Sequence, residues 1–338
     1  MTTRHASLRR ILTGLYLGAC IACAREPDRP LAQGASLEIG YSALRISLPL
    51  LVAQSRGLFA SRGLAVTLKR YETAQPLVED VLDGRLLAGG YAALPIVFTA
   101  ASRGGTRPAL ISAVMEDETH PISYLLKRRG AAPIENVADL RGKRVGVLPT
   151  LAYQKWLAAI LSEAGLAVGD VHVVPLAPAQ QVSGLAEGVV DALFTNDPMA
   201  TSALERGAAE RLGPVAPLVS VVRQPVWFGS MLAHERLLRE RPQDAEKLVA
   251  AIDEAIGYVH ADQAAARRML SPFLRDSERA YVERYPASRY LRSAEIDSAR
   301  LGSERAGQGH PLALAARQGD AALAHDGAEA GGQGGEVA

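Results

Sequence analysis

Apolar and polar positions in the first part of the chain alternate with two periods, one typical of short buried strands and one typical of amphipathic helices. A strand is expected at 37–41, and apolar side chains at helical spacing follow over 47–56. The succession repeats with a strand at 65–71, a helix after Thr73 and a further helix over 94–101. Strands that alternate with helices in this way predict an α/β layer with a parallel core.

The same rhythm returns further along the chain. We expect strands at 143–148, 171–174 and 191–194, with helices at 152–164, 180–187 and from Asp197 to about Arg206. Two α/β units separated near residues 120–126 predict two lobes. After Pro225 the pattern predicts a strand at 227–232, a long helix behind Pro242, and more helices past Leu270 and Tyr281. From about Gly302 the sequence is rich in Gly, Ala and Gln, so residues 301–338 are expected to be a disordered tail.

Residues 1–19 have the composition of a secretory signal peptide. Arginines at positions 4, 9 and 10 precede the apolar run 11–19, and small residues stand before Cys20. Leu17-Gly18-Ala19-Cys20 also resembles a bacterial lipobox, whose cysteine is acylated and becomes the mature N-terminus. We therefore predict a lipid anchor at Cys20, a membrane-anchored location in the periplasm or at the cell surface, and a tether over 20–36. The alternative is a plain signal peptide with an incidental cysteine and a secreted or periplasmic protein.

Charge and cysteine content exclude several classes of function. The 338 residues contain 37 Lys and Arg against 36 Asp and Glu, and the predicted processing leaves a net charge of −2. A nearly neutral chain lacks the long-range attraction on which nucleic-acid binding depends, so no nucleic-acid partner is expected. The two cysteines are at positions 20 and 23, which leaves the body of the chain without a thiol nucleophile or a cysteine metal ligand.

Motifs for catalysis, phosphate binding or metal binding are missing from the sequence. There is no Gly-x-Ser-x-Gly elbow, no Walker loop and no His-Glu-x-x-His. Residues 117–120 (Asp-Glu-Thr-His), preceded by Glu116, could offer a metal ion three acids and an imidazole, but a polar connection between lobes is the favoured interpretation. Tyrosines and arginines over 281–292 are interpreted as a helix surface. The prediction is a protein without cofactor or metal that is not an enzyme.

The order of the motifs resembles the periplasmic solute-binding proteins of ABC importers, in particular the nitrate, sulfonate and taurine branch. The resemblance spans about residues 37–270. Single motifs are weak, but their order matches the family, most closely in the second lobe. The motifs are Gly57-Leu-Phe59, Gly63-Leu-Ala-Val66, Pro95, Asp139-Leu-Arg-Gly-Lys-Arg-Val-Gly-Val147, Gly165-Leu166, Gly188-Val-Val-Asp191-Ala192 and Asn196-Asp-Pro198.

The resemblance implies a two-lobe fold of the periplasmic-binding-protein type II class, with a ligand cleft between the lobes. Residues 37–119 and 223–300 would form the first lobe and residues 120–222 the second, with hinges near His120-Pro121 and Arg223-Pro225. The implied partners are a small-molecule ligand and an ABC permease, and the protein is expected to be a monomer. Tyr91, Leu94, Leu151 and Trp227 near a few polar groups would make a moderately apolar pocket, so the ligand is expected to be a small organic molecule. Helix N-termini at the carboxyl ends of the strands would suit an oxyanion, so one anionic group on that molecule is compatible with the site.

The resemblance also places candidate ligand-binding residues in the loops at the strand ends. They are Ser42, Ala43, Leu44, Arg45, Thr73, Ala74, Gln75, Tyr91, Ala92, Thr150, Leu151, Ala152, Asn196, Asp197, Trp227 and Phe228. Each has a structural alternative: the three aromatics as core residues, Asp197 as a helix cap and Arg45 as a solvated lip residue. Sulfonate, taurine or nitrate specificity does not transfer, because Pro149-Thr150-Leu151 and Asn196 depart from the patterns of those binders.

Other functions of the same fold stay open at this point. A sensor that signals to a membrane receptor is indistinguishable from a transport protein by fold. A pyrimidine synthase of thiamine biosynthesis would need a cysteine-rich iron site, which this chain lacks. The effector lobe of a transcription regulator would need a helix-turn-helix segment where this chain has an export signal.

Overall fold

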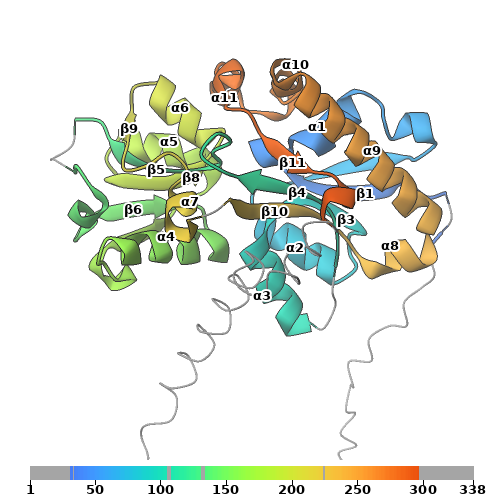
Figure 1. The fold of residues 1–338 in the computed structure, drawn as a ribbon, viewed down its shortest axis with the longest axis horizontal. Helices are drawn as coiled ribbons and strands as arrows, with labels where there is room; N and C mark the ends of the chain where they lie inside the picture. Colours follow the sequence, from blue (N-terminus) through green and yellow to red (C-terminus); the bar gives the residue numbers. More distant parts are fainter. Residues whose placement is uncertain (1–30, 33, 105–107, 131–133, 224, 297–338) are drawn as a thin grey trace, which may run out of the picture. The chain divides into compact units, whose positions relative to one another are not determined.

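The computed structural model describes residues 31–296, apart from 33, 105–107, 131–133 and 224. The predicted signal peptide, Cys20 and the predicted tail at 301–338 lie outside the described residues. Residues 34–296 contain two β-sheets, each with its own helices, which we call the first and the second lobe (Figure 1).

The sheet of the first lobe has six strands in the order β11-β4-β10-β3-β1-β2. Strands β1, β2 and β3 are parallel, whereas β10 is antiparallel to both β3 and β4, and β11 is antiparallel to β4. The strands are β1 (Leu37–Ser42), β2 (Val66–Tyr71), β3 (Ala88–Ala93), β4 (Ala109–Glu116), β10 (Val226–Ala233) and β11 (Arg289–Leu291).

The sheet of the second lobe has five strands in the order β7-β6-β8-β5-β9. Here β6, β7 and β8 are parallel, and β5 runs antiparallel to its neighbours β8 and β9. The strands are β5 (Ser123–Arg128), β6 (Arg144–Val147), β7 (His172–Pro175), β8 (Ala192–Asn196) and β9 (Ala209–Arg211).

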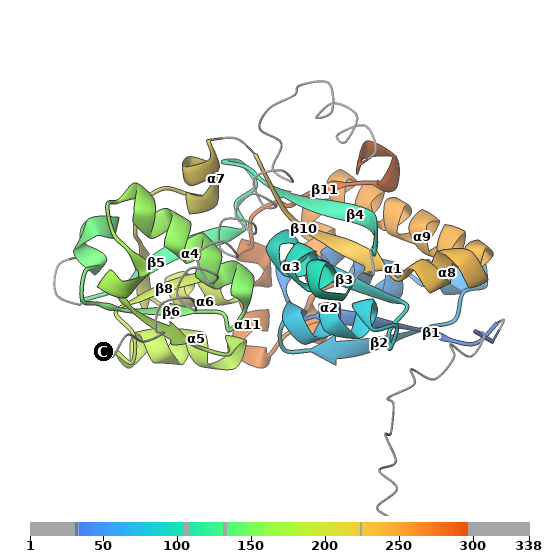
Figure 2. The same ribbon diagram turned by 90° about the horizontal axis from the view of Figure 1, so that it is seen from below.

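Helices cover both faces of each sheet (Figures 1 and 2). The first lobe has α1 (Leu48–Ser55), α2 (Ala74–Leu82), α3 (Leu94–Gly104), α8 (Glu235–Glu240), α9 (Pro242–Ala261), α10 (Gln263–Arg268) and α11 (Asp276–Arg279). The second lobe has α4 (Leu151–Glu163), α5 (Pro178–Ala186), α6 (Met199–Glu205) and α7 (Pro217–Val222). Short 3-10 turns lie at Arg45–Ser47, Ala60–Arg62, Val137–Leu140, Val168–Asp170, Ser271–Phe273 and Val282–Arg284.

The predicted helices and strands form because their apolar stripes face the sheets. In α2 the buried positions are Leu77, Val78, Val81 and Leu82, at the spacing that places them on one helix face. Gly89 of β3 lets this face approach closely, since a Cβ there would stand 2.6 Å from a methyl of Leu77. Pro242 is the first residue of α9, where the missing N–H costs no hydrogen bond.

The structure corrects the sequence prediction in two regions. Residues 123–126, expected as part of the connection between the units, belong to strand β5 at the interior of the second sheet. Past Leu270 the chain forms 3-10 turns, the four-residue helix α11 and the strand β11 rather than a series of helices. The expectation of a parallel core holds for three strands of each sheet, and antiparallel strands complete both.

The chain passes between the lobes at two described points, between β4 and β5 and between α7 and β10. These crossings bring the carboxyl ends of β1, β3, β6 and β8 toward the region where the lobes meet. Open α/β sheets bind their ligands at such strand ends, so the side chains that stand there define the region to inspect.

Candidate ligand-binding site

A buried ion pair joins the two lobes at the ends of β1 and β8. Arg45 lies in the 3-10 turn after β1, Asp197 follows β8, and Arg45 Nε is 3.0 Å from Asp197 Oδ2, with side chains 2% and 0% exposed. The backbone N–H of Arg45 also donates to the Asp197 carbonyl at 3.3 Å. Two loops that the sequence singled out are therefore in direct contact.

All three guanidinium nitrogens of Arg45 donate to the protein. Besides the bond to Asp197, Nη1 donates to Ser288 Oγ at 2.6 Å and to the carbonyls of Pro286 and Ala287, and Nη2 donates to the Pro121 carbonyl. Burial disfavours the charged form, but Asp197 and the neighbouring groups outweigh it, so the pKa of Arg45 is raised. Arg45 is thus a fully bonded cation that ties β1 to the second lobe.

Asp197 combines this contact with a role at the start of α6. Its Oδ1 accepts from the backbone N–H of Thr201 at 3.0 Å and from Thr201 Oγ1 at 2.7 Å, and Oδ2 accepts from Tyr124 Oη at 3.4 Å. The carboxylate satisfies an N–H of the first helical turn, which is what a helix cap does. Helix capping and the ion pair are therefore compatible at this residue.

A second contact between the lobes joins the N-termini of α2 and α4. The backbone N–H of Leu151 donates to Gln75 Oε1 at 3.4 Å, and that of Tyr153 donates to Thr150 Oγ1 at 3.4 Å. Thr73 precedes α2 in an extended conformation without a side-chain cap bond. Ala74 and Ala152 are buried beside these two helix starts.

Four buried polar atoms at the strand ends have no hydrogen-bond partner among the described residues. They are Ser42 Oγ on β1, Glu116 Oε2 on β4, Tyr153 Oη on α4 and Asn196 Oδ1 on β8. The Asn196 amide lowers the pKa of the Tyr153 hydroxyl, against the larger effect of burial, which raises it. Three further such atoms belong to Arg128, Ser202 and Arg267. A buried polar group left unpaired costs about 1–3 kcal/mol, so a group of them at a lobe interface points to a functional site.

Glu116 is the most unusual member of this group. Its Oε1 accepts from the N–H groups of Ile122 (2.8 Å) and Ser123 (2.6 Å) and from Ser123 Oγ (2.8 Å), which fixes the first crossing between the lobes. Burial raises the pKa of Glu116, against the lowering effect of these hydrogen bonds and of Arg45. The pKa of Tyr153 is raised by burial first and by the charge of the same Glu116 carboxylate second.

An aromatic cluster adjoins these polar atoms. Tyr153 packs against Trp156 and Phe194 with ring centroids 5.5 and 5.1 Å apart, and Trp156 packs against Phe228 at 4.7 Å. Phe228 belongs to β10 of the first lobe, so the cluster also spans the interface. The rings of this cluster form an apolar surface next to the unpartnered polar atoms.

The other candidates from the sequence are packed inside the first lobe. Tyr91 is fully buried, its hydroxyl lies 2.6 Å from Ser112 Oγ, and its ring packs edge-on against Tyr290. Trp227 is buried with Leu94, Ala113 and Ile296, and its Nε1 donates to Ser230 Oγ at 2.9 Å. Ala43, Leu44 and Ala92 are part of the main hydrophobic core.

Sequence reasoning did not select Glu116 or Tyr153 as ligand-binding residues. Glu116 is the last residue of β4, whose other residues are largely apolar. A single acid at the end of such a strand is the sequence feature that could have indicated a site. Tyr153 follows the predicted residues 150–152 in the first turn of α4, so extending that prediction by one residue would have included it.

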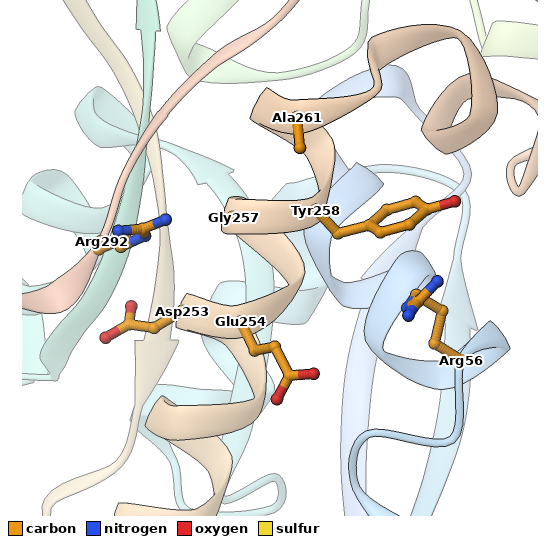
Figure 3. Close-up of a pocket in the computed structure, with 7 residues that line it drawn as sticks. All are labelled: Arg56, Asp253, Glu254, Gly257, Tyr258, Ala261 and Arg292. Carbon is orange, nitrogen blue, oxygen red and sulfur yellow. The ribbon is translucent and has the colours of Figure 1, made fainter.

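A surface hollow of about 540 Å³ lies elsewhere, on the outer side of α9. Figure 3 shows Tyr258 next to Arg56, with Asp253 and Arg292 on the other side of the helix. The Arg56 guanidinium stacks 4.1 Å above the Tyr258 ring, and Asp253 accepts from Ser293. This hollow is formed by one lobe alone and stands away from the strand ends.

Membrane-spanning helices and clustered metal ligands are both missing from the described part of the chain. No helix within it has the length and apolar character needed to cross a membrane. No group of three or more His, Cys, Asp or Glu side chains in the described ranges could hold a metal ion.

Comparison with known proteins finds related sequences and solved structures with a similar fold. A protein of Brucella abortus, whose name describes it as a binding protein without saying what it binds, is 22% identical over 267 residues, 77% of this chain and 78% of that protein. The alkanesulfonate-binding protein SsuA of Xanthomonas axonopodis pv. citri, bound to MOPS, has a TM-score of 0.63 at 22% identity, with 84% of this chain and 99% of that one covered.

An enzyme also has this fold. A mutant of the desulfurisation enzyme DszB, in complex with biphenyl-2-sulfinic acid, aligns with a TM-score of 0.55 at 17% identity over 82% of this chain and 94% of that one. Similarity at this level establishes the fold alone. Periplasmic sulfonate- and nitrate-binding proteins of ABC importers are among the solved structures with the same fold, which confirms the predicted two-lobe class.

The family model for the NMT1-like family matches residues 32–272, which contain the whole second lobe and the first lobe up to α10, including Arg45 and Asp197. The chain belongs to the NMT1-like family.

Proposed function

We propose that this protein is an extracytoplasmic solute-binding protein that captures a small organic molecule between its lobes and delivers it to an ABC permease. The observation that carries the proposal is the set of buried, unpartnered polar atoms of Ser42, Glu116, Tyr153 and Asn196, which come from both lobes. A ligand that pairs with them would offset a cost of about 1–3 kcal/mol for each atom. The fold of relatives named as binding proteins supports the same function.

The ion pair between Arg45 and Asp197 explains how such a site would close. Its partners lie on different lobes, and both side chains are buried in this structure. Closure of two lobes around a ligand gives a membrane partner two states to distinguish. We propose that Ser42, Asn196, Thr150, Leu151, Gln75 and Phe228 face the ligand region, while Arg45 and Asp197 hold the closed state.

Screening for ligands tests the proposal. We expect at least one compound of a metabolite library to raise the melting temperature, since a ligand at 100 times its Kd adds about 2.7 kcal/mol. The bound compound should be recovered chemically unchanged, which separates a binding protein from an enzyme such as the DszB neighbour. The proposed function is wrong if no compound of a broad library raises the melting temperature, or if the bound compound is chemically converted.

We further propose that Cys20 carries a lipid and anchors the protein to the membrane. The support is the sequence Leu17-Gly18-Ala19-Cys20 behind a basic and apolar segment. Globomycin, which blocks lipoprotein processing, is expected to make the unprocessed chain accumulate, and Cys20→Ser should release the protein from the membrane fraction. Cys23→Ser is the matched control and should leave processing unchanged. If neither globomycin nor Cys20→Ser changes the processing of the chain, the segment is a plain signal peptide and Cys20 carries no lipid.

A further inference from the structure

The atoms left unpartnered at the interlobe site include acceptors that cannot donate. Asn196 Oδ1 is an acceptor, and Glu116 Oε2 is one whenever the carboxyl is ionised, while the hydroxyls of Ser42 and Tyr153 can donate or accept. Both acceptor side chains are at least 99% buried. The second lobe and the first crossing therefore present acceptor capacity that the protein itself does not use.

The cationic donor that usually holds an anion is engaged at this place, while the hydroxyls of Ser42 and Tyr153 stay unpaired. The three nitrogens of Arg45 donate to Asp197, Ser288, Pro121 and the neighbouring carbonyls. At the N-terminus of α4, the N–H groups of Leu151 and Tyr153 donate to Gln75 and Thr150. A guanidinium and a helix N-terminus are the usual partners of a carboxylate, sulfonate or phosphate. Here each nitrogen of the guanidinium and two N–H groups of the first helical turn already donate to protein acceptors.

The charges at the interlobe site also disfavour an anionic ligand. Asp197 neutralises Arg45 at 3.0 Å, and Glu116 adds a second carboxyl group to the same region. Anions that enter a region with two carboxyl groups and one paired cation meet like charge. The rings of Tyr153, Trp156 and Phe228 beside these groups suit an apolar body, and such rings also attract cations.

From these contacts we infer that the ligand presents hydrogen-bond donors to Glu116 and Asn196. The chemical class is a small organic amine, amidine or similarly N–H-rich molecule with an apolar or aromatic body, and not a sulfonate or another anion. The inference differs from the sequence-based expectation, which allowed one anionic group on a small organic molecule. It rests on the proposed function, because it names the ligand class of the same interlobe site.

The inference sets the direction of proton exchange on binding. Arg45, Tyr124 and Tyr153 interact electrostatically with Glu116, and burial raises the pKa of Glu116. A donor ligand favours the ionised carboxyl, so binding should release protons and tighten as the pH rises through the Glu116 pKa. An anionic ligand favours the protonated carboxyl, so its binding should take up protons and weaken over the same interval.

The test compares probes with one ring and different polar groups on the full chain. We expect benzamidinium to raise the melting temperature and benzenesulfonate at equal concentration to leave it unchanged. Glu116→Gln keeps the Oε1 acceptor for Ile122 and Ser123 but removes the charge. It should weaken benzamidinium binding by about tenfold or more, the value of a charge-assisted hydrogen bond. Glu118→Gln removes a charge from an exposed neighbour in the same crossing and is the matched control, with no change expected.

Two further measurements keep the inference open to refutation. Asn196→Asp replaces the amide by a carboxylate of nearly equal size and should strengthen benzamidinium binding. Calorimetry of benzamidinium binding in buffers of different ionisation enthalpy should report proton release by the wild type and none by Glu116→Gln. The same comparison is made with panels of amines and amidines and of sulfonates and carboxylates. Stabilisation by the anion panel alone, or proton uptake, overturns the donor inference and leaves the proposed function standing. Stabilisation by neither panel nor the metabolite library overturns both.

Discussion

Replacing Asp197 by alanine is expected to lower the free energy of unfolding by about 3–5 kcal/mol, the usual cost of removing one partner from a buried ion pair. The Arg45 guanidinium would stay buried without its anion, and Thr201 would lose the acceptor for its N–H and its hydroxyl. Urea denaturation of the wild type and the variant gives the difference directly.

Two further variants identify the cause of that loss. Arg45→Met together with Asp197→Leu removes both charges, so the double variant should be more stable than Asp197→Ala, since no unpaired charge remains. Glu283→Ala breaks an ion pair with Arg268 in which both side chains are more than half exposed, and it should change stability little. If Asp197→Ala is as stable as Glu283→Ala, the interlobe ion pair does not contribute in the way described.

The sequence predicted most of the fold because the signal for buried strands and helices is local. Strands β1, β2, β6, β7, β8 and β10 and helices α1, α2, α4, α5, α6 and α9 lie within a few residues of their predicted bounds. Their apolar stripes are set by neighbours in the chain, which is the information that periodicity contains. The family resemblance selected Arg45 and Asp197 among the loop residues at the strand ends, and the structure brings these two into contact.

The missed elements depend on partners that are distant in the sequence. Strand β11 has three residues and exists through its pairing with β4, which lies more than 170 residues earlier. Residues of β5 were predicted as a connection because periodicity cannot tell an antiparallel interior strand from an apolar linker. Short apolar segments of this kind acquire their structure from the sheet that they join.

The same limitation applies to the chemistry of the candidate site. Arg45 stands among apolar residues in the sequence, which is compatible with a solvated lip residue or a buried cation. The decision rests with Asp197, 152 positions away, and with the carbonyls of 286–287, more than 240 positions away. A pattern of residue types contains no record of such pairings, so the sequence did not show that every nitrogen of Arg45 donates to the protein.

Replacing Trp227 by alanine is expected to lower the free energy of unfolding by about 3–5 kcal/mol while leaving ligand affinity unchanged, as for other large buried aromatics. Trp227 is 4% exposed, packs with Leu94, Ala113 and Ile296, and donates its Nε1–H to Ser230. Its neighbour Phe228 lies at a register shift of β10 and contacts Trp156 of the second lobe. Urea denaturation measures the stability, and titration with a ligand from the screen measures the affinity.

Phe228→Ala is the matched variant for this experiment, because it removes a ring of similar burial from the adjacent position of the same strand. It should cost a comparable amount of stability and, in addition, weaken ligand binding, since the aromatic cluster across the interface loses its first-lobe member. A loss of affinity in Phe228→Ala but not in Trp227→Ala would show that Phe228 belongs to the interlobe site and Trp227 to the core of the first lobe. Equal losses of affinity in both, at temperatures where both are folded, would return Trp227 to the ligand-binding residues that the family resemblance implied.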